Sequence, residues 1–424
     1  MHQALTRTAR TKIRQGILLL ACALGSAQAS ALEAPVTRLA LSQAIEAALH
    51  HYPDLGVAQA AIDEARAQLV QAQARPNPEL ELLTGRIHAR RDAGAPGPQY
   101  LLNLAQPLEW PEAREARQES ARQEIVAAEA QASQARAELI QQVKLAYIHV
   151  LSTEESLRLA EEDQQHILGV RDRVKAMVGV GEAPRYEAVK AEAEALAATR
   201  QVETARHQLQ AARGILANLT GSSGSATGPL DAPLPEQVDM ATLRLGMEQT
   251  NPRYARARAA VAAARARVGE ARADRIPPPT LKAGLERYPD SDAWTVGLAM
   301  PIPLLDQRQG QVAAAEARLD RALAEGRLDM LMIERELEQG YHRYRSARAQ
   351  LQAIEGGLLA EAQDALRVAE TAYRAGERGI LDVLDARRTL RAVRLDRIQA
   401  LFDTYAALFD LERLSGTELL RVTP

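Results

Sequence analysis

The chain has 424 residues, with 52 Lys or Arg against 55 Asp or Glu, so its formal net charge at pH 7 is −3. A mildly acidic chain without a basic patch indicates no nucleic-acid partner, and its single cysteine excludes both an internal disulfide and a cysteine cage for zinc. The eight histidines show neither HExxH nor HxxxH spacing, and no phosphate loop or nucleophile–base pair is recognisable. The sequence therefore predicts no enzyme, no cofactor and no metal site.

The first 29 residues are predicted to be a secretory signal peptide. Four cations precede the apolar run GILLLACALG, and Ala27 and Ala29 stand at the −3 and −1 positions of a cleavage site before Ser30. The run is too short to span a bilayer. Cys22, in LLAC, offers a rival interpretation as a lipidation site, which we rank second because few apolar residues would precede it. Without residues 1–29 the chain carries 48 basic and 55 acidic side chains, a net charge of −7.

The rest of the sequence contains an internal duplication. Residues 52–85 align with 251–284 at an offset of 199, and VGEAPRYEAV (180–189) aligns with AGERGILDVL (375–384) at an offset of 195. Several further landmarks keep the same order, which predicts a duplicated domain. The predicted divisions are a first repeat at 30–221, a linker rich in Gly, Ser and Pro at 222–240, a second repeat at 241–416 and a C-terminal tail at 417–424.

Each repeat shows the same succession of expected elements. A first helix, at 42–74 or 241–274, is followed by two short strands between prolines, then by a very long helix, a Gly-rich turn and a return helix. The strands are expected at about 78–88 and 99–107 in the first repeat and at about 280–288 and 293–301 in the second.

The long helices alone would indicate a structural coiled coil. Residues 112–168 contain neither Gly nor Pro, so a helix over them would be about 85 Å long at 1.5 Å per residue. The counterpart at 306–374 contains Gly340, Gly356 and Gly357, which should weaken it.

The four strands decide against that interpretation. Apolar side chains alternate with polar or small ones along each strand, as in Trp294, Val296 and Leu298, and the lengths suit tilted membrane strands. Soluble hairpins packed on helices fit the alternation equally well, but the secretion signal and the polar loops at 86–91 and 288–292 favour a membrane. Lipid cannot satisfy an open sheet edge, so other copies must close the sheet. Three copies make the smallest barrel with an open bore.

The motif YRAGERGILDVLDARRTL (373–390) carries a family resemblance, together with PLEWPEAREAR (107–117) and the duplication. Over essentially its whole mature length the chain resembles the TolC-like outer-membrane efflux proteins. The resemblance implies a mainly α chain with a small β part, built from a duplicated helix–β-hairpin–long helix–helix repeat. It also implies a homotrimer with a 12-stranded β-barrel in outer-membrane lipid, continued by a 12-helix periplasmic α-barrel.

The resemblance further implies the function of a passive exit duct in a tripartite efflux system. An inner-membrane pump and a periplasmic adaptor, a membrane fusion protein, would deliver the substrate. PLEWPEAREAR and the NPEL motif at 77–80 lean towards the heavy-metal-efflux branch. The alternatives are a periplasmic adaptor and a secreted structural coiled coil. An adaptor, however, would carry one hairpin between other domains, whereas this chain has two hairpins.

Two acids lie at the start of the second return helix, just after the Gly-rich turn of the second repeat. By the resemblance, Asp382 and Asp385 of DVLD would line the narrow periplasmic mouth, where three copies would place six carboxylates that favour cations. A plainer reading is that both acids stabilise the start of a helix through its dipole.

The resemblance also assigns roles to the two Gly-rich turns that join each long helix to its return helix, which are called the tips below. Tyr373 and Arg378 on one tip and Glu187 on the other would latch the closed mouth, although solvated turn residues are the plainer reading. Gly181 and Gly376 would end the descending helices in a left-handed conformation. The adaptor would dock on the exposed turns around them.

Overall fold

The structure is a computed structural model that describes residues 38–88, 95–231, 233–235 and 238–420. The predicted signal peptide with Cys22, most of the first strand loop, and parts of the linker and the tail lie outside these residues. Within the described ranges, the helices and the four-stranded sheet belong to the unit Leu39–Pro424. Two further strands, β1 (Arg38–Leu39) and β4 (Ser225–Ala226), have two residues each.

Each half begins with two helices where one was expected. The four helices are α2 (Leu41–His51), α3 (Pro53–Gln73), α6 (Met240–Thr250) and α7 (Pro252–Ala273). The breaks fall at Pro53 and Pro252, because proline lacks an N–H and keeps the preceding residue out of the helical conformation. Each proline instead occupies the first position of the new helix. The prediction of unbroken helices at 42–74 and 241–274 was therefore wrong.

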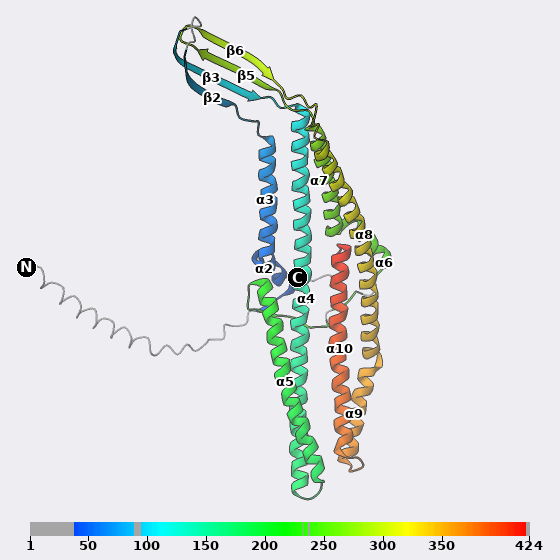
Figure 1. The fold of residues 1–424 in the computed structure, drawn as a ribbon. Coiled ribbons are helices and arrows are strands. Elements are labelled where there is room, and N and C mark those ends of the chain that lie inside the picture. The colour runs from blue at the N-terminus through cyan, green and yellow to red at the C-terminus, as the bar shows by residue number, and fades with distance from the viewer. Residues whose placement is uncertain (1–37, 89–94, 232, 236–237, 421–424) are drawn as a thin grey trace, which may run out of the picture. The chain divides into compact units, whose positions relative to one another are not determined.

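The four longer strands form one antiparallel sheet in the order β2-β3-β5-β6 (Figure 1). Their bounds, β2 (Glu79–Ile87), β3 (Gly97–Pro107), β5 (Thr280–Arg287) and β6 (Asp292–Ala299), lie within two residues of the expected ones. The hairpin of each repeat joins the other through β3 and β5, where Leu102 lies opposite Leu285. Within the part of the chain that the structure describes, β2 and β6 each pair on one side only.

The long helices begin beside the sheet and end at two turns far from it (Figure 1). The first, α4 (Pro111–Gly179), is continuous over 69 residues, about 100 Å at 1.5 Å per residue. Its counterpart is divided into α8 (Gln309–Ala353), a π-helical turn η1 (Ile354–Leu358) and α9 (Leu359–Arg374). Gly357 leaves helical geometry inside η1, so the helix is interrupted at Gly356 and Gly357, whereas α8 runs unbroken through Gly340. The return helices are α5 (Arg185–Thr220) and α10 (Ile380–Ser415). The mainly α fold with a small β part and a duplicated pattern is thus confirmed.

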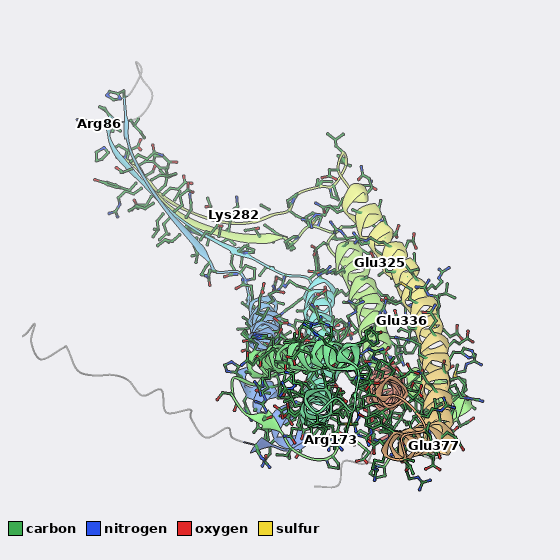
Figure 2. The ribbon with its side chains drawn as sticks, turned by 90° about the horizontal axis from the view of Figure 1, so that it is seen from below. Arg86, Arg173, Lys282, Glu325, Glu336 and Glu377 are labelled. Atoms are coloured by element: carbon green, nitrogen blue, oxygen red, sulfur yellow. The ribbon has the colours of Figure 1, made fainter. Side chains whose placement is uncertain are left out.

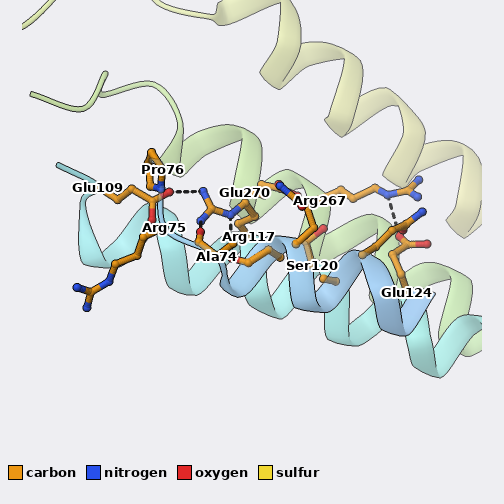
Figure 3. Close-up of a pocket in the computed structure, with 13 residues that line it drawn as sticks. Ala74, Arg75, Pro76, Glu109, Arg117, Ser120, Glu124, Arg267 and Glu270 are labelled. Carbon is orange, nitrogen blue, oxygen red and sulfur yellow. Dashed lines mark hydrogen bonds and ion pairs between the residues drawn. The ribbon is translucent and has the colours of Figure 1, made fainter. Parts of the chain in front are cut away.

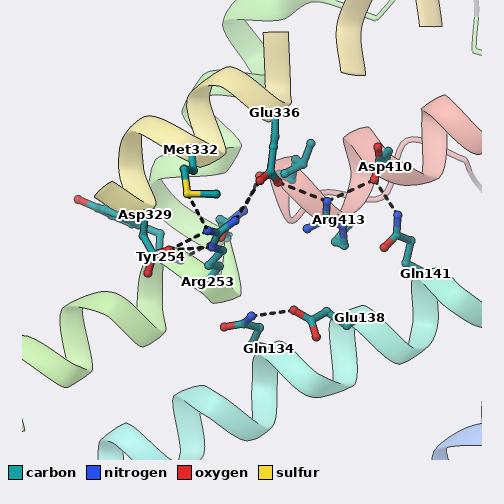
Figure 4. Close-up of polar contacts among 12 residues, drawn as sticks. Gln134, Glu138, Gln141, Arg253, Tyr254, Asp329, Met332, Glu336, Asp410 and Arg413 are labelled. Atoms are coloured by element: carbon teal, nitrogen blue, oxygen red, sulfur yellow. Dashed lines mark hydrogen bonds and ion pairs between the residues drawn. The ribbon is translucent and has the colours of Figure 1, made fainter. Parts of the chain in front are cut away.

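Charged side chains connect the helices of the second half (Figure 4). Arg253 of α7 donates to Asp329 of α8 at 2.8 Å and to Glu336 of α8 at 3.2 Å. Glu336 also forms an ion pair with Arg413 of α10, at 3.7 Å. Deeper in the molecule, Lys144 of α4 pairs with Glu412 of α10 at 2.8 Å, and both side chains are about nine-tenths buried. These contacts join α7, α8 and α10 within the second repeat and connect α10 to α4 of the first repeat.

Candidate functional site

One face of the sheet is an exposed apolar surface. The register aligns Leu82, Leu102, Leu285 and Trp294 in one row across all four strands. The next row begins with Leu80 and ends with Val296. The exposed apolar side chains of this face, each between 39% and 76% exposed, are Leu80, Leu82, Tyr100, Leu102, Leu104, Leu281, Leu285, Trp294, Val296 and Leu298. Figure 2 shows the sheet and its side chains standing clear of the helices.

The opposite face of the sheet is mostly polar or small, although Leu83 and Leu101 also lie on it. Glu81, Asn103, Gly284 and Thr295 form one row across it, and Asn103 Nδ2 donates to Glu81 Oε2 at 3.3 Å. A Cβ at Gly284 would lie 2.7 Å from oxygens of both Asn103 and Thr295, so glycine is needed for these two side chains to converge. Lys282, labelled in Figure 2, lies on the same face. The sheet therefore separates an apolar surface from a polar one, as an outer-membrane strand pattern does.

The two tips end in the same backbone motif. Gly181 and Gly376 have φ of +81° and +75°, as the sequence predicted. At the first tip the N–H of Glu182 donates to Met177 O at 2.9 Å, and the N–H of Gly181 donates to Val178 O at 3.2 Å. Equivalent bonds, both of 3.0 Å, close the second tip at residues 372–377. These are Schellman motifs, which satisfy the last carbonyls of a helix. No heavy atom lies within 4 Å of a Cβ at either glycine, so both turns are open to a partner.

The tips are packed together by an apolar cluster. Ile380, Val383 and Leu384 at the start of α10 lie against Val174 of α4 and Ala191 of α5, and all five are buried. The acids Asp382 and Asp385 alternate with these residues on the same helix turn and are exposed. Packing therefore turns the apolar side chains inward and leaves both carboxylates in solvent.

The proposed latch residues meet only in part. Tyr373 Oη contacts Met177 Sδ across the tips at 3.4 Å. The pKa of Tyr373 is raised, first by burial and then by the negative charge of Glu187, which places that carboxylate nearby. Glu187 Oε1 lies 3.7 Å from the position of a Cβ on Gly379, so it reaches the second tip. Arg378, however, lies in the turn before α10 and pairs with Asp382 in the first turn of that helix, at 3.6 Å, and both side chains are exposed.

A row of arginines on α10 makes stronger contacts between the hairpins, and sequence reasoning missed it. Arg391 donates to Asp163 of α4 at 3.1 Å and to Gln201 of α5 at 2.7 Å, and Asp163 is buried. Arg388 pairs with Glu194 of α5. The spacing in ARRTLRAVR places arginines on one helix face and was a readable signal. It does not reveal which helix that face meets.

An open groove below the sheet is lined by α3, α4 and α7 (Figure 3). Arg117 donates to Glu109 at 2.5 Å and to Ala72 O at 3.1 Å, and Arg267 pairs with Glu124 at 2.8 Å. The hydrogen bond that Arg117 donates to the carboxylate of Glu109 is the main reason that the pKa of Arg117 is raised. These pairs join the first helices of both repeats to α4, which is a structural role.

Within the described ranges, no group of three or more His, Cys, Asp or Glu side chains is arranged to hold a metal ion. None of the helices in those ranges is both long enough and apolar enough to cross a membrane.

Comparison with known proteins gives consistent matches. The family model described as "Outer membrane efflux protein" matches residues 44–222 and 247–417. The chain is 28% identical to the cobalt-zinc-cadmium resistance protein CzcC of Cupriavidus metallidurans, over 89% of this chain and 90% of CzcC. It is 29% identical to the nickel-cobalt-cadmium resistance protein NccC of Alcaligenes xylosoxydans, over 79% and 75% of the two chains.

Two further comparisons concern cargo and fold. The pyoverdine export outer membrane protein OpmQ of Pseudomonas aeruginosa is 26% identical over 87% of this chain and 84% of OpmQ. The solved structure of the outer-membrane channel OprN superposes with a TM-score of 0.76 at 22% identity, covering 89% of this chain and 90% of OprN. That likeness establishes the fold.

Proposed function

Because the chain belongs to the outer membrane efflux protein family, we propose that it is the outer-membrane channel of a tripartite efflux system whose cargo is divalent transition-metal cations. The observation that carries this proposal is the four-stranded sheet, which has an exposed apolar face and, among the described residues, no partner strand at either edge. The channel is a passive duct, and the pump supplies the energy.

The exposed face is too costly to leave in water. Ten apolar side chains at 39% to 76% exposure represent on the order of 10 kcal/mol of unrealised burial, at roughly 1 kcal/mol each. That sum is comparable with the whole stability of a domain. Lipid removes the cost on the face, but it cannot pair the edges of β2 and β6. A second and a third copy would pair them, so we propose a homotrimer with a 12-stranded barrel and a 12-helix periplasmic continuation.

The cargo proposal draws on the relatives and on the tips. Two relatives are named for resistance to cobalt, cadmium and other divalent metals. Exposed Asp382 and Asp385, present in three copies at the mouth, would favour such cations over anions. The relative named for pyoverdine export makes an organic compound of that kind the second candidate cargo.

The tips would serve the gate and the partners. We propose that Tyr373, Arg378 and Glu187 latch the closed mouth, with Arg378 exchanging its partner Asp382 for Glu187 of the same or a neighbouring copy. Support comes from the position of Glu187 beside the second tip. The open turns at Gly181 and Gly376 would receive the periplasmic adaptor, which links the channel to an inner-membrane pump.

The location follows from the same assignment. We propose that the sheet lies in the outer membrane and the helices in the periplasm. Residues 1–29 would direct export as a cleaved signal peptide, and lipidation of Cys22 is the second option. Mass spectrometry of the mature N-terminus distinguishes the two, because cleavage before Ser30 removes Cys22 altogether.

A deletion strain with matched variants tests the proposal. Loss of the gene should lower tolerance to Co²⁺, Zn²⁺ and Cd²⁺, and the wild-type chain should restore it. Val296→Lys places a cation on the lipid face, at a cost of about 2–4 kcal/mol near the bilayer midplane, and should neither insert nor restore tolerance. Thr295→Lys, one residue away on the polar face, should do both.

Two results would count against it. Equal insertion and tolerance for the two lysine variants would show that the apolar face does not lie in lipid. Unchanged metal tolerance in the deletion strain, with loss of siderophore export instead, would replace the metal cargo by an organic one.

A further inference from the structure

The apolar surface of the sheet continues beyond the last strand. β6 ends at Ala299, yet Met300, Ile302, Leu304 and Leu305 are 49%, 71%, 78% and 96% exposed. Leucines this exposed in the segment between β6 and α8 extend the apolar surface of the sheet and need a covering partner.

The backbone presents these side chains in a fixed way. Met300 and Ile302 each precede a proline, which restricts both to an extended conformation. The N–H of Leu304 donates to Ile302 O at 2.9 Å, closing a tight turn that ends the extended run. The N–H of Arg308 then donates to Asp306 Oδ1 at 2.8 Å, where the polar sequence begins.

The first repeat has a matching feature. Leu108 and Trp110, which lie after β3, are 41% and 39% exposed, and Trp110 aligns with Leu304 across the duplication. The N–H of Leu108 donates to Pro279 O at 2.7 Å, and Trp110 Nε1 donates to Pro277 O at 3.1 Å. A tryptophan with its ring partly exposed and its N–H bonded is typical of a membrane–water interface.

Strand length explains why the surface must continue. The apolar stripe of β6 within the sheet, from Trp294 to Leu298, covers about 14 Å of chain at 3.4 Å per residue. Tilted by about 40°, it spans only about 10 Å of the roughly 25 Å apolar band of an outer-membrane barrel. Extension to Ile302 doubles that height to about 20 Å, and Leu304 and Leu305 lie beyond it.

We propose that segments 107–110 and 300–305 form the periplasmic rim of the lipid-contacting surface and that phospholipid covers Leu304 and Leu305. This inference rests on the proposed membrane location of the sheet. The covering partner is lipid rather than a second copy of the chain, because a continuous row of exposed apolar side chains runs from Trp294 through Val296, Leu298 and Met300 into this rim. The water boundary then falls at Asp306, below the ends of the strands.

The native tryptophans allow a direct test, since the chain contains only Trp110 and Trp294. The Trp110→Phe variant keeps Trp294 of the sheet as the only tryptophan, which is excited selectively over the tyrosines. In a background with both tryptophans changed to Phe, Leu305→Trp reports on the rim and Val368→Trp, on the exposed surface of α9, serves as the control. Each chain is reconstituted in vesicles of phosphatidylethanolamine and phosphatidylglycerol with brominated acyl chains, and acrylamide probes access from water.

The expected result is loss of most of the fluorescence of Trp294 and of Leu305→Trp to brominated lipid, with no such loss for Val368→Trp. Quenching of Trp294 alone would overturn the rim while leaving the sheet in lipid. Shielding of Leu305→Trp from both lipid and acrylamide would overturn it in favour of a covering copy. If brominated lipid quenches neither probe, the membrane location itself is wrong.

Discussion

The buried carboxylate of Asp163 should govern how firmly α10 is held against α4 and α5. Asp163 is 9% exposed in its side chain, and its partner Arg391 is 25% exposed. Replacement of Asp163 by Ala leaves the guanidinium with Gln201 as its remaining partner. Breaking a buried pair typically costs about 3–5 kcal/mol, and the partial exposure of Arg391 reduces this to about 2–3 kcal/mol. Arg394→Ala is the matched control, because its pair with Glu162 is 3.9 Å long and both side chains are at least 40% exposed.

Hydrogen exchange of the α10 amides measures this difference locally, since exchange follows the population of the opened segment. A loss of about 2–3 kcal/mol should speed exchange by roughly 30- to 150-fold in Asp163→Ala. The control pair is worth about 0–1 kcal/mol, so Arg394→Ala should change exchange by roughly fivefold or less. Similar exchange rates in the two variants would refute the reasoning that burial of Asp163 decides the strength of this contact.

Three further predictions concern the tips and the core. Gly376→Ala should destabilise the second turn by about 1–2 kcal/mol, because a left-handed residue with a Cβ is strained, and Gly181→Ala should do the same to the first; hydrogen exchange at the turns would show no change if the left-handed caps do not matter. The double change Asp382→Asn and Asp385→Asn should reduce cation selectivity, measured as a smaller reversal potential in a planar bilayer under a salt gradient, and an unchanged potential would remove both acids from the mouth. Burial raises the pKa of Tyr405 to about 12, so the folded state should lose about 2–3 kcal/mol as pH rises from 10 to 12, where only the unfolded phenol ionises freely; if Tyr405→Phe keeps the wild-type slope of stability against pH, the loss has another source.

The sequence indicated the strands well because alternation is a local property. Leu82 and Trp294 each belong to a period-two run bounded by turn residues, and such runs constrain the limits of a strand closely. The pairing of β3 with β5 could not be predicted from the sequence, because a contact between residues about 180 positions apart leaves no trace in the local sequence pattern. Pro53 and Pro252 do indicate where the first helices break. The apolar residues keep helical spacing across both prolines, however, and this spacing favoured one continuous helix in each repeat.

The candidate site, too, could be predicted from the sequence only where local chemistry determines the conformation. Left-handed Gly181 and Gly376 followed from chemistry, because glycine adopts that conformation with little strain. The partner of Arg378 did not, since Asp382, four residues further along the same tip, competes with Glu187 on the other tip. The sequence does not distinguish Arg391 from the other arginines of α10, and only the contact of its guanidinium with Asp163 of α4 reveals the buried partner.

The mass of the detergent-extracted protein tests the central claim most directly. The full chain is 46.2 kDa, and the account predicts that light scattering, after correction for bound detergent, gives three times the mass of the mature chain. The protein should require detergent to leave the membrane fraction. A monodisperse monomer in buffer without detergent would contradict the account, because four strands with an exposed apolar face and two open edges would then be complete on their own.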